Sequence, residues 1–433
     1  MVVFILAVLL AAGWYQTLFG SGVRKKAEYK ESVSVAEEYN SRGLYQKAVQ
    51  EYKKAIGIQN DKATWEDMLA SYESRYQESS RIYGEYLDAA KQAASEYGDN
   101  PKFVLTLAKL YVDNGNYVEA HRCLKKAVDN GMEDESVLAM LREVGYGYEL
   151  AWHTYDAFRS CTNGYFAVSE EGNWKYLKAD GTEDDSMGES YEFASMAGED
   201  GVRVMCKGGK GELVDSSGIV QGKIDFVPTE AMAYAEGLVP LEKGMVFSYY
   251  NALGDEVFGG YDFASSFTEG KAAVYDDKWK IIDTEGNVVS EEAYADIIFN
   301  IEGSYILNNV IVAQMGDAYA LYNGKGEKIG DFTCEEMDKY SGDGMIAFCK
   351  NGKWGYVDIK GKIVIEPQFE KAKSFANGLA GVCVNDKWGF IDETGAIVVE
   401  PIFLDVDYFN EKGKCMVETG TGNWQMLSMN VWE

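Results

Sequence analysis

The feature that most constrains the fold of this chain is a phrase that occurs twice almost unchanged. Residues 352–369 read GKWGYVDIKGKIVIEPQF, and residues 386–403 read DKWGFIDETGAIVVEPIF. Self-similarity at a fixed period indicates a repeat architecture, in which each unit buries its apolar face against its neighbours. We therefore expect this part of the chain to be built from stacked copies of one small unit.

The phrase can be written W-G-[YF]-[VI]-D-x-x-G, and its final glycine and preceding strand can be followed through eight units. The positions equivalent to its tryptophan are 32 to 40 residues apart: Trp174, Gly211, Phe247, Trp279, Tyr319, Trp354, Trp388 and Trp424. A second glycine lies ten residues before that position in five units, at Gly164, Gly201, Gly237, Gly344 and Gly378. Gly270 and Gly413 miss this offset by one residue, and the unit at Tyr319 lacks the glycine. Two anchors that stay in phase support one common register.

Each unit divides into three or four short strands. In the copy around Trp388, the alternating segment GLAGVCV ends at a polar turn, KWGFID follows, and a Glu-Thr-Gly turn leads to AIVVEPIF. Such turns reverse antiparallel strands tightly, and a unit of about 36 residues has the size of a small propeller blade. Residues 148–433 are thus predicted to form an all-β repeat domain, an eight-bladed β-propeller. An open β-solenoid and two smaller sheets are the alternatives.

The ends of this array favour a closed ring. The last unit stops at Glu433 without the P-x-F strand. Before the first unit, Tyr155 precedes Gly164 by nine residues, and Phe369 stands at the same offset before Gly378. The segment before the first unit is therefore expected to complete the last blade. Closure of the ring removes the exposed edge strands of an open sheet.

These units resemble the WG (KWG) repeat family of bacterial proteins, in which KWG-[YF]-[IV]-D-x-x-G precedes an apolar strand and E-P-x-[FY]. The match is close over Lys353–Phe369 and Lys387–Phe403, partial over Lys278–Val289, and weak elsewhere. Gly211 and Phe247 stand where the family has tryptophan. The resemblance implies a β-repeat interaction module without established catalysis, in a surface- or envelope-associated scaffold.

Residues 28–147 form helical repeats by the same kind of argument. The stretch is rich in Ala, Glu, Lys and Tyr, and two of its segments match at an offset of 72 residues, twice 36. Small alanines let antiparallel helices approach closely, and a glycine permits the turn between them. The matched residues are Ala36, Tyr39, Gly43, Tyr45, Ala48, Tyr52 and Ala55 in the first segment, and Ala108, Tyr111, Gly115, Tyr117, Ala120, Leu124 and Ala127 in the second.

This order resembles the tetratricopeptide repeat (TPR) over residues 33–130, with a degenerate middle unit around Trp65 to Tyr97. Residues 134–144 are expected to form a closing helix. The resemblance implies a concave groove that binds peptides or partner proteins. A spacer or packing module made of so few units is the alternative.

Residues 1–23, MVVFILAVLLAAGWYQTLFGSGV, carry no charge. The apolar part from Met1 to Phe19 is just long enough to cross a bilayer core, which takes about 20 residues in a helix, and Trp14 and Tyr15 would lie toward one interface. The pattern predicts an uncleaved N-terminal transmembrane helix and a single-pass location at the cell membrane. A cleaved signal peptide and a buried helix are the alternatives.

The side of the membrane that would hold the soluble part stays open. Arg24, Lys25 and Lys26 follow the apolar segment, which favours the cytoplasm by the positive-inside rule, and unpaired cysteines agree. Family habit favours the extracytoplasmic side, because single N-terminal anchors most often export the domain behind them. The predicted organisation is a transmembrane anchor at 1–23, a juxtamembrane linker at 24–32, TPR-like repeats at 33–147 and the WG-type β-repeat domain at 148–433.

Composition argues against several classes of function. A net charge of −29, from 41 basic and 70 acidic residues, argues against nucleic-acid binding, which depends on Lys and Arg contacts with phosphates. Neither a disulfide framework nor a zinc site is expected, because the cysteines form no CxxC pair and His121 and His153 have no ligand at metal spacing. The seven cysteines are Cys123, Cys161, Cys206, Cys334, Cys349, Cys383 and Cys415.

Residues that could carry chemistry have structural interpretations. The tryptophans are expected to pack between neighbouring sheets rather than to form platforms for glycans. The acidic run at 180–185 predicts a solvated loop rather than a calcium site, and GGKG at 208–211 lacks the Lys-Ser/Thr of a phosphate loop. No GxSxG or HExxH motif is present. Four repeated aspartates are expected to cap tight turns rather than to bind metal: Asp215, Asp283, Asp358 and Asp392.

The sequence therefore predicts a non-enzymatic, membrane-anchored interaction scaffold that binds a protein or peptide through its TPR-like and WG β-repeat modules. The alternative is a ligand- or carbohydrate-sensing module with a glycan or small-ligand site on the β-repeat domain. No catalytic, metal or cofactor-binding residue is predicted. The binding residues and the oligomeric state are not fixed by the sequence.

Overall fold

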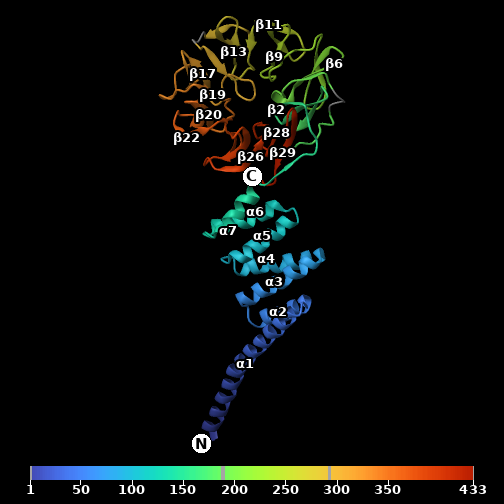
Figure 1. Cartoon of the computed structure of the whole chain (residues 1–433), viewed down its shortest axis with the longest axis vertical. Coiled ribbons are helices and arrows are strands. Elements are labelled where there is room, and N and C mark those ends of the chain that lie inside the picture. The colour runs from blue at the N-terminus through green and yellow to red at the C-terminus, as the bar shows by residue number, and fades with distance from the viewer. Residues whose placement is uncertain (1, 187–190, 291–293, 433) are drawn as a thin grey trace. The chain divides into compact units, whose positions relative to one another are not determined.

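The computed structural model describes residues 2–186, 191–290 and 294–432, with side chains from residue 22 onward. The chain divides into two compact units, residues 1–147 and 148–433. The first unit is helical, and the second is built from β-sheets (Figure 1).

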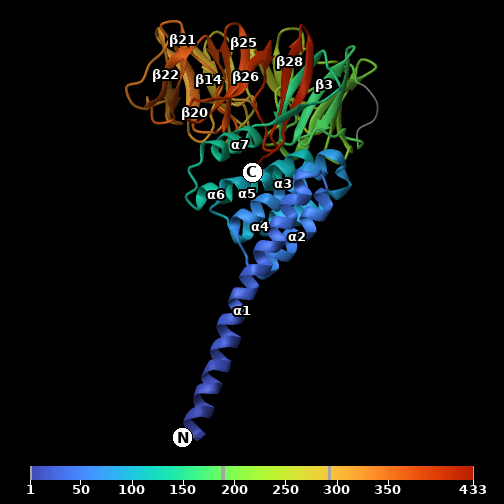
Figure 2. The same cartoon turned by 60° about the horizontal axis from the view of Figure 1, so that its bottom comes forward.

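One continuous core runs through the helical unit from Ala36 in the first helix to Leu110 in the fifth. Figure 2 shows these helices from a second side. In chain order they are α1 (Val2–Ser41), α2 (Tyr45–Ile58), α3 (Lys62–Glu78), the short 3₁₀ helix η1 (Ser80–Ile82), α4 (Tyr83–Glu96), α5 (Pro101–Asp113), α6 (Tyr117–Asp129) and α7 (Glu135–Gly145).

The two matched segments fold alike. Gly43 and Gly115 end α1 and α5 in the left-handed region, at φ 69° and 72°, where glycine carries no steric penalty. The amide after each glycine donates to the carbonyl five residues back, at 2.9 and 2.8 Å. The prediction of equivalent helical hairpins is confirmed, and the alanines at their interfaces have no exposed surface: Ala36, Ala48, Ala108 and Ala120.

The middle hairpin, α3 and α4, departs from this pattern. Tyr72 occupies the position of Ala36 and Ala108, 36 residues from each. Its ring stacks on Tyr86 of α4, with centroids 5.5 Å apart and planes 7° apart. An aromatic pair thus replaces the small-residue contact of the other hairpins, and the connection between α3 and α4 contains η1.

The predicted membrane anchor is corrected by the structure. No helix among the described residues is long and apolar enough to cross a membrane, which contradicts both the transmembrane helix at 1–23 and the single-pass location. A crossing takes about 20 predominantly apolar residues, and the described side chains of α1 begin with Val23, which is followed by Arg24, Lys25 and Lys26. The side chains of residues 1–21, on which the prediction rested, lie outside the described residues. Residues 24–32 continue α1 without a break.

The second unit contains eight sheets, or blades, among its described residues. Figure 1 shows them around a common centre, with β9 and β19 on the inside of the ring and β11 and β22 on its outside. This confirms the eight-bladed propeller and excludes the open solenoid.

The blades are numbered here in chain order. Blade 1 holds β2 (Ala157–Thr162), β3 (Tyr165–Glu170) and β4 (Asn173–Lys178); blade 2 holds β5 (Phe193–Ala194), β6 (Arg203–Lys207), β7 (Lys210–Val214) and β8 (Val220–Ile224). Blade 3 holds β9 (Leu238–Glu242), β10 (Phe247–Asn251) and β11 (Glu256–Tyr261); blade 4 holds β12 (Phe263–Ala264), β13 (Lys271–Tyr275), β14 (Trp279–Asp283) and β15 (Val288–Ser290).

Blade 5 holds β16 (Asp296–Ile298), β17 (Ile311–Met315) and β18 (Ala318–Tyr322); blade 6 holds β19 (Glu336–Met337), β20 (Met345–Lys350), β21 (Lys353–Asp358) and β22 (Ile363–Phe369). Blade 7 holds β23 (Lys371–Ala372), β24 (Leu379–Val384), β25 (Lys387–Asp392) and β26 (Ile397–Phe403); blade 8 holds β27 (Asp405–Val406), β28 (Lys414–Gly420), β29 (Asn423–Met429) and β1 (Tyr148–Leu150).

The predicted register holds in every blade. Each tryptophan-equivalent position lies at the start of the same strand of its blade, including Gly211 in β7 and Phe247 in β10, where the phrase itself is lost. The turn glycines nine to eleven residues earlier all have positive φ, between 66° and 87°. In blade 5, which lacks this glycine, Asn308 and Asn309 take the left-handed conformation at 51° and 61°, which asparagine tolerates better than most residues.

The W-G pair and the E-P segment of the repeated phrase meet at one β-bulge between neighbouring strands. A Cβ on Gly355 of the W-G pair would lie 2.5 Å from the carbonyl oxygen of Ile365 and 2.7 Å from the nitrogen of Pro367. Gly389 meets the next E-P segment in the same way. The pairing register shifts on both sides of Tyr356, opposite this segment. Glycine is therefore required because the bulged outer strand crosses directly over it.

The ring closes as predicted. β1 pairs antiparallel with β29, with Leu150 opposite Leu427. The backbone of Tyr155 exchanges two hydrogen bonds of 2.8 Å with Trp424. Phe369 pairs with Trp354 at the equivalent place in blade 6. The outer strand that the last unit lacks is thus supplied by the segment before the first.

Candidate functional site

In the helical unit, two ion pairs connect α3 with α5. Lys102 Nζ lies 2.7 Å from Glu66 Oε2, and Lys109 Nζ lies 3.4 Å from Glu73 Oε1. Both pairs join residues 36 positions apart, the length of one repeat, so α3 and α5 run side by side in register.

A cavity of about 500 Å³ lies between α3 and α5. Its floor is apolar and buried, because Leu69, Tyr86 and Phe103 are each at most 4% exposed. A second cavity of about 200 Å³ shares Tyr86 and Thr106 with the first and extends to Asp113. We call the two together the α3–α5 groove. An apolar floor with a few polar side chains on its walls is the usual composition of a binding site.

The walls of the groove carry unequal charge. The hydrogen bond from Lys102 lowers the pKa of Glu66. Asp67, on the same turn of α3, has no ion-pair partner among the described residues. Burial and the charges of Glu37 and Glu66 raise its pKa, and the charge of Lys102 opposes this only in part. Negative potential therefore accumulates around Asp67.

A second cluster of charge lies on the inner strands of the propeller. In each blade, one residue ends the continuous backbone pairing between the innermost strand and the next strand. In blades 6, 7, 8 and 1 this residue is charged, and the sign alternates around the ring: Asp338, Lys373, Asp407 and Arg159. The same position holds Ser195, Met232 and Ser265 in blades 2, 3 and 4.

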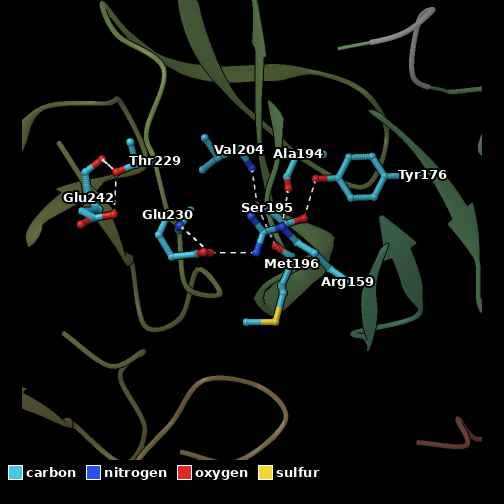
Figure 3. A network of polar contacts seen from close by, with 10 residues as sticks. Arg159, Tyr176, Ala194, Ser195, Met196, Val204, Thr229, Glu230 and Glu242 are labelled. Atoms are coloured by element: carbon cyan, nitrogen blue, oxygen red, sulfur yellow. Dashed lines mark hydrogen bonds and ion pairs between the residues drawn. The ribbon is translucent and has the colours of Figure 1, made fainter. Parts of the chain in front are cut away.

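Arg159 connects three blades, as Figure 3 shows. Its Nε donates to the carbonyl oxygen of Ala194 in blade 2, and its Nη1 pairs with Glu230 Oε1 before blade 3, both at 2.8 Å. The guanidinium also lies over the rings of Trp174 and Phe193, 5.6 and 5.3 Å from their centroids. Both hydrogen bonds of the Arg159 guanidinium therefore join blade 1 to other blades.

The other three charges also bridge blades. Asp338 Oδ2 accepts hydrogen bonds from the amide of Ser374 in blade 7, at 2.6 Å, and from the hydroxyl of Tyr408 in blade 8, at 2.7 Å. Lys373 Nζ lies 3.5 Å from an oxygen of Asp405. Asp407 Oδ1 accepts from Ser160 of blade 1 at 2.8 Å.

Asp407 combines deep burial with an incomplete set of hydrogen bonds. Its residue is 4% exposed, and its Oδ2 has no hydrogen-bond partner among the described residues. Burial raises the pKa of Asp407, an effect that Lys373 and the bond from Ser160 partly oppose.

On the other side of the ring, blade 5 carries a loop that contacts other blades. The 40-residue unit that ends at Tyr319 contains an insertion, and Asn300 Oδ1 closes it by accepting the amides of Glu302 and Ser304, both at 2.9 Å. A Cβ on Gly303 would lie 3.4 Å from Met232 Sδ and 3.5 Å from Met196 Cε. The loop of blade 5 therefore reaches residues of blades 2 and 3.

The turn-capping role predicted for the repeated aspartates is confirmed. Each repeated aspartate accepts backbone amides two and four residues later, at 2.8 to 3.2 Å, as a turn cap does. Trp279 is buried, and the tryptophans at the other four WG positions are half-buried within their blades. The amides of Gly208 and Gly209 donate to Glu192 of the same chain, at 2.9 and 3.1 Å. All seven cysteines are free thiols.

The acidic run at 180–185 is not simply a solvated loop. Asp180 caps a local turn through the amide of Thr182, but Asp184 is buried. Its Oδ2 lies 2.7 Å from Nη1 of Arg203, whose side chain has no exposed surface. The guanidinium lies over Tyr165 at 4.0 Å and Tyr176 at 4.7 Å. Only the fold brings Arg203 to this carboxylate, so the run alone could not show the pair.

Comparisons with known families agree with this architecture. The model described as WG containing repeat matches residues 319–354, 354–388 and 388–424. The tetratricopeptide repeat model matches residues 84–144, which span α4 to α7. The chain carries both kinds of repeat. No curated protein matches the sequence.

Several solved structures show distant likeness. Yeast Tom70 is 19% identical over 28% of this chain and 24% of its own, with a TM-score of 0.25. PorZ, a surface component of the type-IX secretion system of Porphyromonas gingivalis, is 11% identical over 63% and 42%, with a TM-score of 0.34. BBS1N in complex with ARL6DN is 12% identical over 65% and 96%, with a TM-score of 0.33. At these scores the likeness extends to neither partner nor function.

Proposed function

We propose that this protein is a non-enzymatic interaction scaffold that binds a segment of a partner protein in the α3–α5 groove. The observation that carries this proposal is the buried floor of Leu69, Tyr86 and Phe103 beneath accessible polar walls. An apolar side chain of a partner would find a desolvated surface there, and the walls would fix its orientation.

The propeller supports a scaffold role in a different way. The charged groups at its inner strands are held by neighbouring blades, as for Arg159 and Asp338. These contacts stiffen the ring and leave fewer free polar groups near its axis. TPR and WG repeats together suit a protein with more than one docking surface.

A ligand site at the propeller axis is the second candidate. One observation favours it: the buried Asp407 Oδ2 lacks a hydrogen-bond partner among the described residues. A thermal-shift screen of sugars and small cations tests it, because a ligand of the folded state raises the melting temperature. If a ligand raises the melting temperature of Asp407→Asn as much as that of the unmodified protein, this site is rejected.

The groove is tested by filling it. Peptides selected for binding to the full chain are measured against Thr106→Trp, which places a large side chain in both cavities, and against Asp129→Trp at the exposed end of α6. We expect Thr106→Trp to weaken binding at least tenfold, and Asp129→Trp to leave it unchanged. Equal affinity for both variants, with unchanged melting curves, would contradict the proposal.

A further inference from the structure

We propose that the α3–α5 groove selects a peptide that carries a Lys or Arg next to an apolar residue. The positive charge would pair with Asp67, and the apolar side chain would lie over Leu69 and Phe103. This inference rests on the proposed function, because it names the kind of segment that the groove accepts.

The first step concerns the positive charges of the groove. Lys102 and Lys109 are the lysines that line it, and each has its ammonium within 4 Å of a glutamate of α3. A carboxylate of an acidic peptide would have to compete with Glu66 and Glu73 for them. Among the described residues, the groove therefore offers no unpaired cation to an acidic partner.

The second step concerns the negative charges that remain. Four carboxylates line the two cavities, against two lysines, so the excess charge of the lining is negative. Asp67 makes no ion pair among the described residues, and the charge of Glu37 of α1 outweighs that of Lys102 at its carboxylate. A cation placed beside Asp67 would lower the energy of both charges.

The third step gives the spacing of the ligand. Asp113 is the other carboxylate of the described groove that has no ion pair. Because residues of α3 and α5 that are 36 positions apart lie side by side, Asp113 is level with Gln77 of α3. Gln77 lies ten residues after Asp67, roughly 15 Å along the helix. An extended peptide covers that distance in about four or five residues. Two basic residues at this spacing would meet both carboxylates.

The groove thus differs from a plain cluster of acidic residues. Its charge excess flanks an apolar floor that is 1–4% exposed at Leu69, Tyr86 and Phe103, so the two kinds of contact are available to one segment. A segment with charge alone would leave the floor uncovered, and one with apolar residues alone would leave Asp67 without a counterion.

Fluorescence anisotropy on the full chain tests the inference with synthetic peptides. One peptide carries two lysines five residues apart with a leucine beside the first, a second has glutamates in their place, and a third has acetyl-lysines. We expect the lysine peptide to bind at least tenfold more tightly than the other two. Binding should weaken as salt rises from about 0.05 to 0.5 M, because exposed charges are then screened.

Variants connect the effect to Asp67. Asp67→Asn should weaken binding of the lysine peptide about tenfold, whereas Asp88→Asn, which removes an exposed carboxylate of α4 outside the groove, should not. Asp67→Lys should reverse the preference toward the glutamate peptide. Unchanged melting curves establish that these variants remain folded.

The outcomes separate the two proposals. Tight binding of the glutamate peptide, or binding that is indifferent to salt and to Asp67→Asn, overturns the charge preference and leaves groove binding in place. If none of the peptides binds, and peptides selected without bias are insensitive to Thr106→Trp, the proposed function itself fails.

Discussion

Charged residues link neighbouring repeats in both units, but at opposite extremes of exposure. In the helical unit, the side chains of Lys109 and Glu73 are 63% and 46% exposed. In the propeller, those of Arg203 and Asp184 are 0% and 2% exposed. Water competes with the first pair and not with the second. The comparison teaches that the Arg203–Asp184 pair is part of the propeller core, whereas the groove charges are available to a partner.

The largest effect is expected from the removal of one buried charge. Arg203→Met should lower the free energy of unfolding of the propeller by about 3–5 kcal/mol, because Asp184 would be left buried without its partner. Urea unfolding followed by tryptophan fluorescence measures this loss. Arg203→Met combined with Asp184→Leu should recover most of it, since no unpaired charge remains. A double variant as unstable as the single one would contradict this account.

The second prediction concerns backbone contact rather than charge. Gly355→Ala should lower the free energy of unfolding by about 1–3 kcal/mol, because its Cβ would overlap the backbone of Ile365 and Pro367. Gly57→Ala in α2 is the matched change in the helical unit, where a Cβ meets no atom within 4 Å. It should stabilise the protein by up to about 1 kcal/mol. Both follow from urea unfolding, and an equal effect at the two sites would refute the role of the bulge.

The third prediction uses pH. Burial raises the pKa of Asp407 in the folded protein. At pH values between the unfolded pKa of about 3.9 and the folded pKa, the native state therefore binds more protons than the unfolded state. The stabilisation that this carboxyl provides is complete below the unfolded pKa and is lost as pH rises through the folded pKa. The stability of Asp407→Asn relative to the unmodified protein should therefore increase with pH above about 4. Unfolding curves at several pH values measure this difference.

Ser160→Ala is the control for that experiment. It removes the hydrogen bond to Asp407 Oδ1 but keeps the carboxyl group, so its pH dependence should still resemble that of the unmodified protein. A difference between Asp407→Asn and the unmodified protein that stays flat with pH would mean that the carboxyl titrates normally.

The smallest effect is expected in the groove. Glu73→Gln should change the free energy of unfolding by less than about 1 kcal/mol, because exposed ion pairs are weak and salt screens them. Thermal or urea unfolding at low and high salt measures this change. If Glu73→Gln lowers the free energy of unfolding as much as Arg203→Met does, the contrast between the exposed and the buried ion pair is wrong.

The repeat register could be predicted because it depends on backbone geometry that recurs. The W-G and E-P segments meet at one bulge, and the turn glycines adopt positive φ, so phase alone located blades 2 and 3, where Gly211 and Phe247 replace the tryptophan. Alanine spacing located the helical hairpins for a similar reason.

The charges at the inner strands could not be predicted, because the residue type at their repeat position changes from blade to blade. The inner-strand position changes from Arg159 to Ser195 to Met232 in successive blades, and the contact from Arg159 to Glu230 spans two blades. One signal was available: Arg159 and Lys373 both lie five residues before a turn glycine. The groove needed the fold, since Tyr86 of α4 reaches a cavity between two other helices. The anchor prediction is contradicted, because no helix among the described residues is long and apolar enough to cross a membrane.

The pairing of β1 with β29 has a consequence for synthesis of the protein. Tyr148 and its partner Met429 are 281 positions apart, so at about 5–20 residues per second the ribosome needs roughly 15–60 seconds between them. During that time β1 has no partner strand, and blades 1 to 7 can form ahead of it. Completion of blade 8 is therefore the last step of assembly, and it belongs to the period after residue 429 has been made.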